Sequence, residues 1–293
     1  MSTDGTGTRS VLEEAATISG IDPDGAVLIR RGSNSIYRIG DLIARIGTTG
    51  AAEVAQQELR ISQWLSHSGL PAVEAADVAI PMVVVDGRPV TWWKRIPDHR
   101  PSTPAELGAA LQHLHDLAPP TAFALPDYDP FLGIRQRIVV AGDLAVEDRN
   151  WLLAHHDSLL DHYMNLDPPA VRAVIHGDAW QGNVVVPSDG VPTILDLERV
   201  SMGRKEWDLV QIAADYVDFD RLSSHDYASF VDAYDCDVTA HGSFRLLANI
   251  QELRWTAFAL SQSETNAKAS EQVRHRLACL RGEIARPWRW EAL

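Results

Sequence analysis

The chain has 293 residues, of which 45% are hydrophobic and 23% are charged, and its formal net charge is −14. This composition is typical of a folded globular protein and excludes disordered and fibrous classes. At this length we expect two lobes rather than a single core. The acidic balance disfavours nucleic acid as a partner, because binding to a phosphate backbone depends on Lys and Arg.

Targeting signals are absent from the sequence pattern. No run approaches the roughly 20 apolar residues of a membrane span, and the first ten residues are polar, without the apolar core of a signal peptide. Two cysteines, Cys236 and Cys279, are too few for a disulfide-rich secreted domain. We therefore expect a cytoplasmic protein without membrane or nucleic-acid partners, whose oligomeric state the sequence leaves open.

The N-terminal part predicts a small antiparallel sheet with one helix. A short amphipathic segment at 11–19 comes first, and Gly40-Asp41 is a hairpin signal between two apolar strands. Residues 51–66 have a helical apolar period that ends before Gly69. The expected strands are 26–30, 36–39, 42–46, 78–85 and 90–93.

The composition changes at residues 96–101, where a polar run with two prolines ends the last of these strands. We place the lobe boundary there, with residues 1–95 as the nucleotide-binding lobe and residues 96–293 as the lobe for catalysis, metal and acceptor. The second lobe is predicted to be mainly helical. Its expected helices are 104–117, 130–141, 146–166, 205–217, 225–234, 243–263 and 268–281, and its strands are 184–186 and 193–195.

One stretch of the second lobe carries the polar residues that phosphoryl transfer requires. Asp178 follows the apolar run at 170–175, Asn183 lies five residues later, and Asp196 ends the next strand. Asp178 is the predicted general base, because a positioned carboxylate can accept the proton of an alcohol. Asn183 and Asp196 offer the oxygen ligands that Mg²⁺ prefers. Singly, such residues are common in turns, but their order and spacing favour a phosphotransferase.

The same residues resemble a known family. Residues 176–183, with the pattern His-Gly-Asp-x-x-x-x-Asn, are similar to the catalytic loop of the aminoglycoside phosphotransferases, and Ile-Leu-Asp at 194–196 resembles their metal-binding strand end. The resemblance spans essentially the whole chain. It implies an α+β, two-lobed protein-kinase-like fold, with a small antiparallel-sheet N-terminal lobe and a larger, mainly helical C-terminal lobe. It also implies Mg²⁺ as cofactor and ATP or GTP as co-substrate.

For the nucleotide phosphates, the family uses a strand lysine paired with a helix glutamate. No lysine precedes Lys94 here, so the role falls to Arg45, with Glu58 as its partner and Glu53 as the second choice. An arginine keeps the charge but not the geometry of an ammonium. An exposed strand arginine and solvated helix acids are the alternative interpretation.

Two further segments complete the nucleotide side. Small residues at 32–35 form a turn whose N–H groups can face phosphates. Residues 92–94 fall where the resemblance places the hinge between the lobes, whose backbone would bind adenine, although adjacent tryptophans also suit a core. The nucleotide-binding candidates are thus Arg45, Glu58, Ser33, Asn34, Ser35, Trp92, Trp93 and Lys94.

The acceptor side is less marked. Residues 215–237 contain seven aspartates, and any that face the cleft would attract an amine-bearing acceptor, although most are expected on solvated helix faces. Asp215, Asp218 and Glu252 are the acceptor candidates. By the resemblance, His176 and Asp208 support the catalytic loop, Asp208 by accepting backbone N–H groups. The alternative for Asp208 is a simple acid at a helix N-terminus.

The sequence therefore predicts a kinase that transfers the γ-phosphoryl of ATP or GTP to a hydroxyl of a small, amine-bearing acceptor. The resemblance implies an antibiotic of aminoglycoside, nucleoside or peptide type, or a related metabolite. A housekeeping kinase for choline, homoserine or an amino sugar would use the same site. A noncatalytic nucleotide-binding protein is the alternative from another class, which the complete set of Asp178, Asn183 and Asp196 disfavours.

Overall fold

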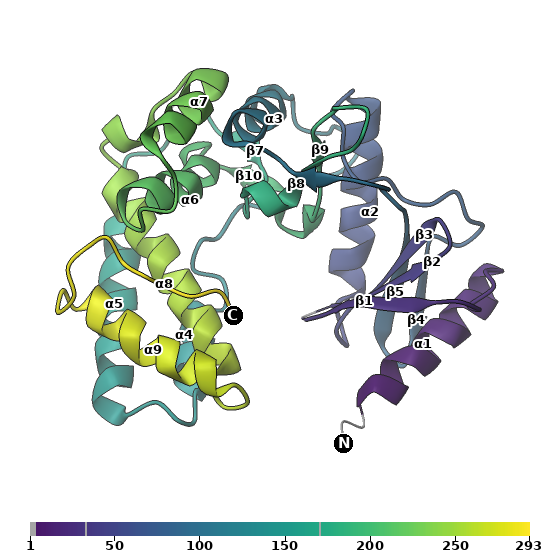
Figure 1. Cartoon of the computed structure of the whole chain (residues 1–293), viewed down its shortest axis with the longest axis horizontal. Coiled ribbons are helices and arrows are strands. Elements are labelled where there is room, and N and C mark those ends of the chain that lie inside the picture. Colours follow the sequence, from purple (N-terminus) through teal and green to yellow (C-terminus); the bar gives the residue numbers. More distant parts are fainter. Residues whose placement is uncertain (1–3, 33, 170) are drawn as a thin grey trace. The chain divides into compact units, whose positions relative to one another are not determined.

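The computed structural model describes residues 4–32, 34–169 and 171–293 (Figure 1). The chain divides into two compact units, each formed by two separate stretches. The first comprises Met1–Ser102 and Gln181–Val200, and the second comprises Thr103–Trp180 and Ser201–Leu293. Residues 181–200 therefore pack with the N-terminal part of the chain. The functional lobes with a boundary after residue 95 stay a prediction.

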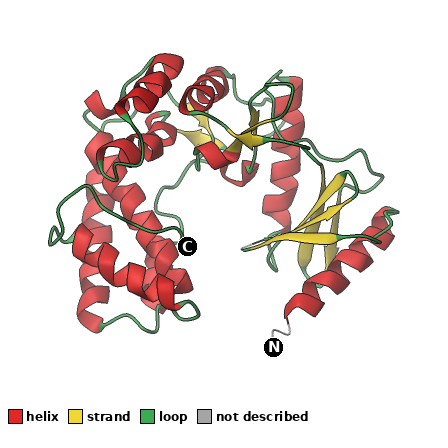
Figure 2. Ribbon diagram, in the orientation of Figure 1, coloured by secondary structure: helices red, strands yellow, loops and turns green. Residues whose placement is uncertain are grey.

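Within the described residues, a five-stranded antiparallel sheet forms the centre of the first unit (Figure 2). The strands expected from the sequence are confirmed, although the last but one begins at Met82 and not at residue 78. The reason is Pro81, which has no N–H to continue the ladder. In sheet order the strands are β1 (Val27–Arg31), β2 (Ser35–Ile39), β3 (Leu42–Ile46), β5 (Arg88–Lys94) and β4 (Met82–Val85).

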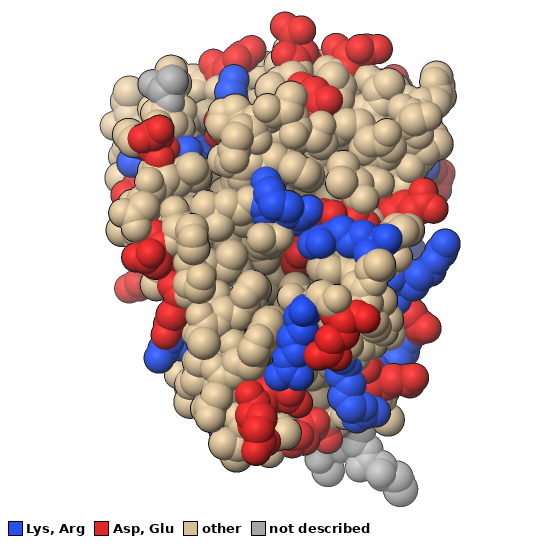
Figure 3. Space-filling view, turned by 90° about the vertical axis from the view of Figure 1, so that its left-hand side faces the viewer, with Lys and Arg blue, Asp and Glu red and all other residues tan. Residues whose placement is uncertain are grey.

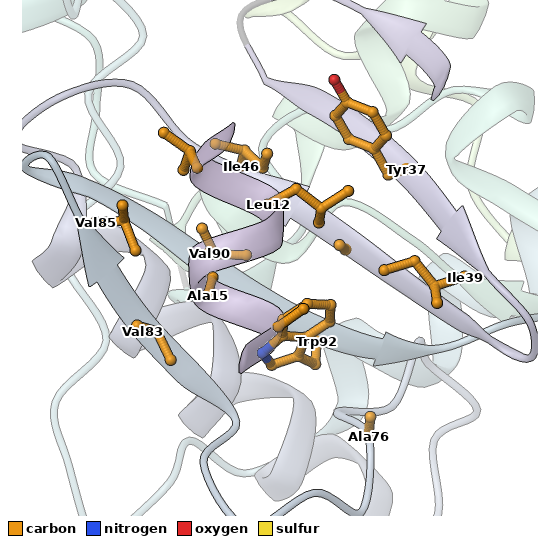
Figure 4. Packing of buried hydrophobic residues seen from close by; sticks show 13 residues of the cluster. Leu12, Ala15, Tyr37, Ile39, Ile46, Ala76, Val83, Val85, Val90 and Trp92 are labelled. Atoms are coloured by element: carbon orange, nitrogen blue, oxygen red, sulfur yellow. The ribbon is translucent and has the colours of Figure 1, made fainter. Parts of the chain in front are cut away.

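Helix α1 (Asp4–Ser19) packs on one face of this sheet. Figure 4 shows Leu12 of α1 beside Ile46 and Trp92 of the strands, and all three side chains are fully buried. Burial of each such side chain stabilises the fold by roughly 1.5–3 kcal/mol. Because side chains alternate along a strand, Arg45, next to Ile46, points to the opposite face of the sheet.

A hairpin from the second stretch of the first unit completes it. Strands β8 (Val184–Val186) and β9 (Thr193–Ile194) pair antiparallel as predicted, and β6 (Arg100–Pro101) pairs with β8. The hairpin is tied to the chain that follows α2 (Ala52–His67), because Ile194 exchanges backbone hydrogen bonds of 2.8 and 3.0 Å with Val73 and Pro71. These bonds place the end of the hairpin beside α2.

The second unit is mainly helical, as predicted. Helix α3 begins with a capping box between Thr103 and Glu106. The helix predicted at 130–141 begins only at Ile134, because Gly133 has a left-handed backbone conformation with φ of 76°. The helices are α3 (Pro104–Asp116), α4 (Ile134–Val140), α5 (Val146–Met164), α6 (Glu206–Val217), α7 (Ser224–Tyr234), α8 (Phe244–Ser263) and α9 (Ala267–Leu280).

A short two-stranded antiparallel sheet pairs β7 (Ala173–Ile175) with β10 (Ser201–Gly203) in the second unit. Strand β10 was not expected, because Ser-Met-Gly lacks the apolar alternation of a strand. The α+β class expected from the sequence is confirmed. Among the described residues, none of the helices combines the length and the apolar character that a membrane span needs.

Candidate active site

A buried carboxylate holds the loop that follows β7 in the second unit. Asp208, in the first turn of α6, is 1% exposed. It accepts the backbone N–H groups of His176 at 2.6 Å and Gly177 at 2.8 Å. His115 Nε2 lies 2.9 Å from the same carboxylate, and His115 Nδ1 lies 2.7 Å from the hydroxyl of Tyr234. Helices α3, α6 and α7 therefore fix the backbone of this loop together.

Gly177 turns the chain toward Asp178. Its φ of 79° lies in the left-handed region, where a side chain would be strained. Its carbonyl accepts hydrogen bonds from Tyr128 Oη at 2.9 Å and Trp207 Nε1 at 3.3 Å. Asp178 follows half-buried, and its N–H donates to Nδ1 of the buried His176 at 3.2 Å. The backbone leading to Asp178 is thus anchored on both sides.

We expect Asp208→Asn to lower the free energy of unfolding by about 3 kcal/mol. The amide nitrogen of asparagine would face a buried N–H group whose hydrogen bond the carboxylate of Asp208 now accepts. Chemical denaturation of both proteins measures the difference. Asp232→Asn is the matched control, because Asp232 is exposed on α7 and its replacement should change stability by less than about 0.5 kcal/mol. Equal effects of the two substitutions would contradict the anchoring role of Asp208.

Arg45 is the centre of a carboxylate cluster in the first unit. Its guanidinium Nη1 donates to Glu58 Oε1 of α2, while Nη2 lies 2.6 Å from Glu198 Oε2 and 3.5 Å from Asp196 Oδ1. With its amide oxygen turned toward the guanidinium, Asn34 accepts from Nε at 2.9 Å and from Nη2 at 2.7 Å. Strand β3, helix α2, the turn before β2 and the chain after β9 therefore meet at one side chain.

Burial and charge shift the ionisation of this cluster. Burial raises the pKa of Glu58 to about 7; Arg45 opposes this rise, while Asp196 and Glu198 add to it. Burial lowers the pKa of Arg45, but the three carboxylates outweigh it, so that the pKa is raised. Three carboxylates around one guanidinium leave an excess of negative charge when all are ionised, which favours a bound cation.

The raised pKa of Glu58 predicts a loss of stability with rising pH. The pKa of Glu58 in the folded protein, about 7, exceeds the ordinary value of 4.5. Its contribution to stability is therefore complete below pH 4.5 and is lost as the pH rises through about 7. The unfolding free energy of the wild type should fall between about pH 5 and about pH 7.5. We expect this fall to be about 2 kcal/mol smaller in Glu58→Gln. Denaturant titrations across this range without nucleotide measure it.

Some of the slope should remain in that variant, because burial also raises the pKa of Glu252, in the second unit, to about 7. The matched control is Glu53→Gln, because Glu53 is exposed on the same helix as Glu58. If Glu58→Gln left the pH dependence as steep as in Glu53→Gln, the protonation of Glu58 in this window would be refuted.

A cavity of about 260 Å³ opens beside the cluster in the first unit. Asn34, Arg45, Glu58, Thr91 and Glu198 are among the residues that line it. Thr91 is the cross-strand neighbour of Arg45. The cavity therefore presents a guanidinium, carboxylates and a hydroxyl on one side of the sheet.

Asn183 and Asp196 lie at the same end of the β8–β9 hairpin. The N–H of Leu195 donates to the carbonyl of Asn183 at 2.8 Å, which extends the strand pairing by one step. Asp196 has a φ of 55°, a left-handed conformation that non-glycine residues rarely adopt, and its side chain is 46% exposed. One neutral and one anionic side chain, each with an oxygen atom that can bind a cation, therefore flank this end of the hairpin, Asn183 just before β8 and Asp196 two residues after β9.

These two residues fit the coordination that Mg²⁺ takes in nucleotide sites. No group of three or more His, Cys, Asp or Glu side chains in the described chain is arranged to hold a metal ion. Mg²⁺ is typically bound by one or two protein oxygens and completes its shell with waters and substrate phosphates. A pair of oxygen ligands beside the negative excess around Arg45 is compatible with that chemistry.

The hinge candidates lie at the end of β5. Trp92 is fully buried against α1, and Trp93 is 4% exposed, with its indole donating to Thr91 at 2.8 Å. Lys94 is exposed and pairs with Glu74 at 2.7 Å. The tryptophan side chains contribute to packing, so a contact with a base would involve the backbone of this segment.

The remaining candidates of the first unit are scattered. Ser35 is buried at the start of β2, where it pairs with Ile46. Glu53 is exposed on α2, whereas Glu58 of the same helix contacts Arg45. Ser33 lies outside the described residues. Asn34 is therefore the candidate from the turn before β2 that contacts Arg45.

The acceptor candidates of the second unit are each paired with arginine. Asp215 lies 2.7 Å from Arg221. Asp218 and Glu252 are 0% and 1% exposed, and both contact the same two arginines, Arg245 and Arg286. None of the three carboxylates is left unpaired for the amine of an acceptor.

Three residues at the sites were not found from the sequence. Glu198 had one available signal, because it is an acid two residues after Asp196. His115 and Tyr234 had none, since His115 reaches Asp208, and Tyr234 reaches His115, only through the packing of α3, α6 and α7. Their positions depend on tertiary structure alone.

The comparison with known folds agrees with the prediction. The chain is similar to an amicoumacin kinase in complex with AMP-PNP and Ca²⁺, with 12% identity, 97% of each chain covered and a TM-score of 0.76. It is similar to a choline/ethanolamine kinase family protein from Mesorhizobium loti, with 17% identity, 97% of this chain and 95% of that chain covered and a TM-score of 0.66. The two-lobed protein-kinase-like fold is therefore confirmed.

An aminoglycoside phosphotransferase from Streptomyces rimosus is also similar, with 17% identity, 83% of this chain and 97% of that chain covered and a TM-score of 0.61. No curated protein matches the chain by sequence. The model of the phosphotransferase enzyme family, APH, matches residues 27–247, well over half of the chain. The chain therefore belongs to this phosphotransferase family, which confirms the resemblance to the aminoglycoside phosphotransferases.

Proposed function

We propose that this protein is a kinase that transfers the γ-phosphoryl group of ATP or GTP to a hydroxyl of a small acceptor. The observation that carries the proposal is the cluster in the first unit, where Arg45 is held by Glu58 and lies 3.5 Å from Asp196. A guanidinium that can contact phosphate, the carboxylate that holds it and an acid that can bind a metal ion thus occur together. Membership of the phosphotransferase family supports the same activity.

In this proposal Arg45 contacts the nucleotide phosphates through its guanidinium, which suits bidentate contacts to phosphate oxygens. Glu58 keeps the guanidinium in place. Asn183 and Asp196 would hold Mg²⁺, which neutralises the negative charge of the phosphates when it is bound. A cation held by Asp196 would weaken the attraction between this carboxylate and Arg45, and Arg45 would then be freer to contact phosphate.

Asp178 acts in the proposal as the general base. Its carboxylate accepts the proton of the acceptor hydroxyl as the hydroxyl oxygen forms a bond to the γ-phosphorus. The bond between the γ-phosphorus and the bridging oxygen breaks, and the nucleoside diphosphate leaves. Asp208 acts as a positioning residue, because it anchors the two residues that precede Asp178.

The acceptor that we propose is an antibiotic or a related amino-containing metabolite. Two of the similar structures, an amicoumacin kinase and an aminoglycoside phosphotransferase, are named for antibiotics, which supports this class. A third is named for choline and ethanolamine, so a housekeeping metabolite kinase is the second candidate function. A small-molecule acceptor is common to both.

A nucleotide-consumption screen tests the proposed function. The protein is incubated with Mg²⁺ and either ATP or GTP, over a panel of hydroxylated amines, antibiotics and hydroxy acids. We expect consumption that depends on one class of acceptor. Tight nucleotide binding without consumption for any acceptor would instead favour a noncatalytic nucleotide-binding protein.

A further inference from the structure

A cavity of about 320 Å³ lies within the second unit, between α5, α8, α9 and the chain that follows α9. Asn249, Glu252, Arg286, Trp288 and His155 are among the residues that line it. Its volume falls within the range of small-molecule pockets. Polar side chains converge on one wall and an aromatic ring stands beside them, which is the usual composition of a ligand site.

The acids at this cavity are neutralised by arginines. Arg245 contacts Asp218 and Glu252, both at 2.8 Å, and Arg286 contacts the same two carboxylates at 2.7 and 3.0 Å. Two positive and two negative charges leave no net negative charge to attract an amine. Burial raises the pKa of Glu252 to about 7, although Arg245 and Arg286 oppose this rise. Glu252 is therefore partly protonated near neutral pH, which makes the net charge of these four side chains positive.

The hydrogen-bonding groups that remain at the cavity are mainly donors. Arg286 stacks on Trp288 at 3.9 Å and uses Nε and Nη2 for its ion pairs. Within the described residues, its Nη1 has no hydrogen-bond partner. Asn249 accepts from Arg245 Nε through Oδ1 at 2.9 Å, and its Nδ2 makes no hydrogen bond to the described part of the chain.

The wall from α5 adds a neutral ring. His155 stacks on Trp151 at 4.9 Å, and its Nε2 is buried without a partner among the described residues. Burial, and then the neighbouring His156, lowers the pKa of His155. Figure 3, which shows the molecule from the left-hand side of Figure 1, has acidic and basic side chains next to each other in its lower half.

We propose that this cavity binds an oxyanion of the acceptor, a carboxylate or a phosphate, through Arg286 Nη1 and Asn249 Nδ2. The proposal rests on the proposed function, because it names the chemical class of the acceptor of that reaction. An acceptor with an amine would then be zwitterionic, and its amine would be bound elsewhere.

Helix α6 relates this cavity to the catalytic loop within the second unit. Asp208, which anchors the loop, lies in its first turn, and Asp218, which holds Arg286, follows its last residue. Ten residues of α-helix correspond to about 15 Å. The proposal therefore requires an acceptor that is long enough to span a separation of this order between its oxyanion and its reacting hydroxyl.

Asn249→Asp tests the proposal most sharply. Aspartate has the shape of asparagine and keeps the oxygen that accepts from Arg245, but it adds a negative charge to the cavity. Benzoate and phenyl phosphate serve as oxyanion probes, and benzylamine as the cationic probe, with binding to the full chain measured by ligand-observed NMR. Arg274→Gln is the control, because Arg274 is exposed on α9 and does not line the cavity.

We expect benzoate, phenyl phosphate or both to bind the wild type. A comparison of their affinities shows whether the site prefers a carboxylate or a phosphate. Asn249→Asp should weaken this binding by about tenfold or more, and Arg274→Gln should leave it unchanged. Binding of benzylamine, tightened by Asn249→Asp, would overturn the proposal, as would the absence of oxyanion binding to the wild type. Arg286→Lys keeps the positive charge but loses the planar pair of donors. It should also weaken oxyanion binding, although, unlike Asn249→Asp, it adds no carboxylate to the cavity.

An activity measurement separates this inference from the proposed function. Hydroxy acids from the acceptor screen are compared with their primary amides. If transfer occurs but the amides serve as well as the acids, the inference fails and the kinase remains. If the oxyanion probes bind as expected but no acceptor supports transfer, the proposed function fails, and with it the assignment of the bound oxyanion to an acceptor.

Discussion

Replacement of Asp178 by alanine is expected to lower kcat by about 10³-fold, within the range that general-base catalysis contributes. The affinity for the magnesium nucleotide should stay close to that of the wild type, because the proposed nucleotide ligands Arg45, Asn183 and Asp196 all belong to the first unit, whereas Asp178 belongs to the second. Steady-state kinetics with the acceptor found by the screen, together with equilibrium binding of a nonhydrolysable nucleotide, measures both quantities.

Asp178→Asn refines this experiment. Asparagine keeps the size of the side chain and its position after Gly177, but it cannot accept the proton of a hydroxyl in the same way. Asp232→Asn, on an exposed face of α7, controls for the loss of one negative charge. Activity of Asp178→Asn equal to that of Asp232→Asn would refute the assignment of the base.

Asp196→Asn is expected to lower kcat/KM by about 10³-fold or more, because the site would lose its proposed anionic metal ligand and with it several kcal/mol of charge stabilisation. Asparagine is chosen because it tolerates the left-handed backbone of this position, where φ is 55°. The concentration of Mg²⁺ that gives half of the maximal rate should rise. Kinetics as a function of Mg²⁺ concentration measures this shift.

Glu198→Gln is the matched comparison for Asp196→Asn. Both substitutions remove a negative charge that contacts Arg45, and Glu198 is the closer, at 2.6 Å against 3.5 Å. If Asp196 acted only through Arg45, Glu198→Gln would be the more damaging change. We expect the opposite order, with a larger increase in the Mg²⁺ requirement for Asp196→Asn.

The sequence predicts the parts of the fold that depend on local patterns. The strand alternation around Ile46 and the helical period of α2 give the right elements, and the resemblance paired Arg45 with Glu58, which contact each other. The hairpin that carries Asn183 and Asp196 likewise follows from two apolar runs around a polar turn. The short strand β10 was missed because its sequence has no apolar pattern that would predict a strand.

Contacts between distant segments were beyond the sequence. Arg286 lies in the irregular chain after α9, and its pairing with Asp218 and Glu252 depends on how that chain packs on α8. The sequence shows the acids but not the arginines that pair with them, so a role of Asp218 and Glu252 in binding an acceptor stays a prediction. The face of the sheet on which Trp92 lies was equally hidden, because alternation does not tell which side carries α1.

The decisive test of the proposed transfer reaction follows an isotopically labelled γ-phosphoryl group from ATP or GTP, in the presence of Mg²⁺. We expect the wild type to transfer the label to a hydroxyl of the acceptor, and we expect Asp178→Ala and Asp196→Asn to lose nearly all of this transfer. Label that stays on the nucleotide with every acceptor, or that appears on the acceptor equally in the Asp178→Ala variant, would contradict the account.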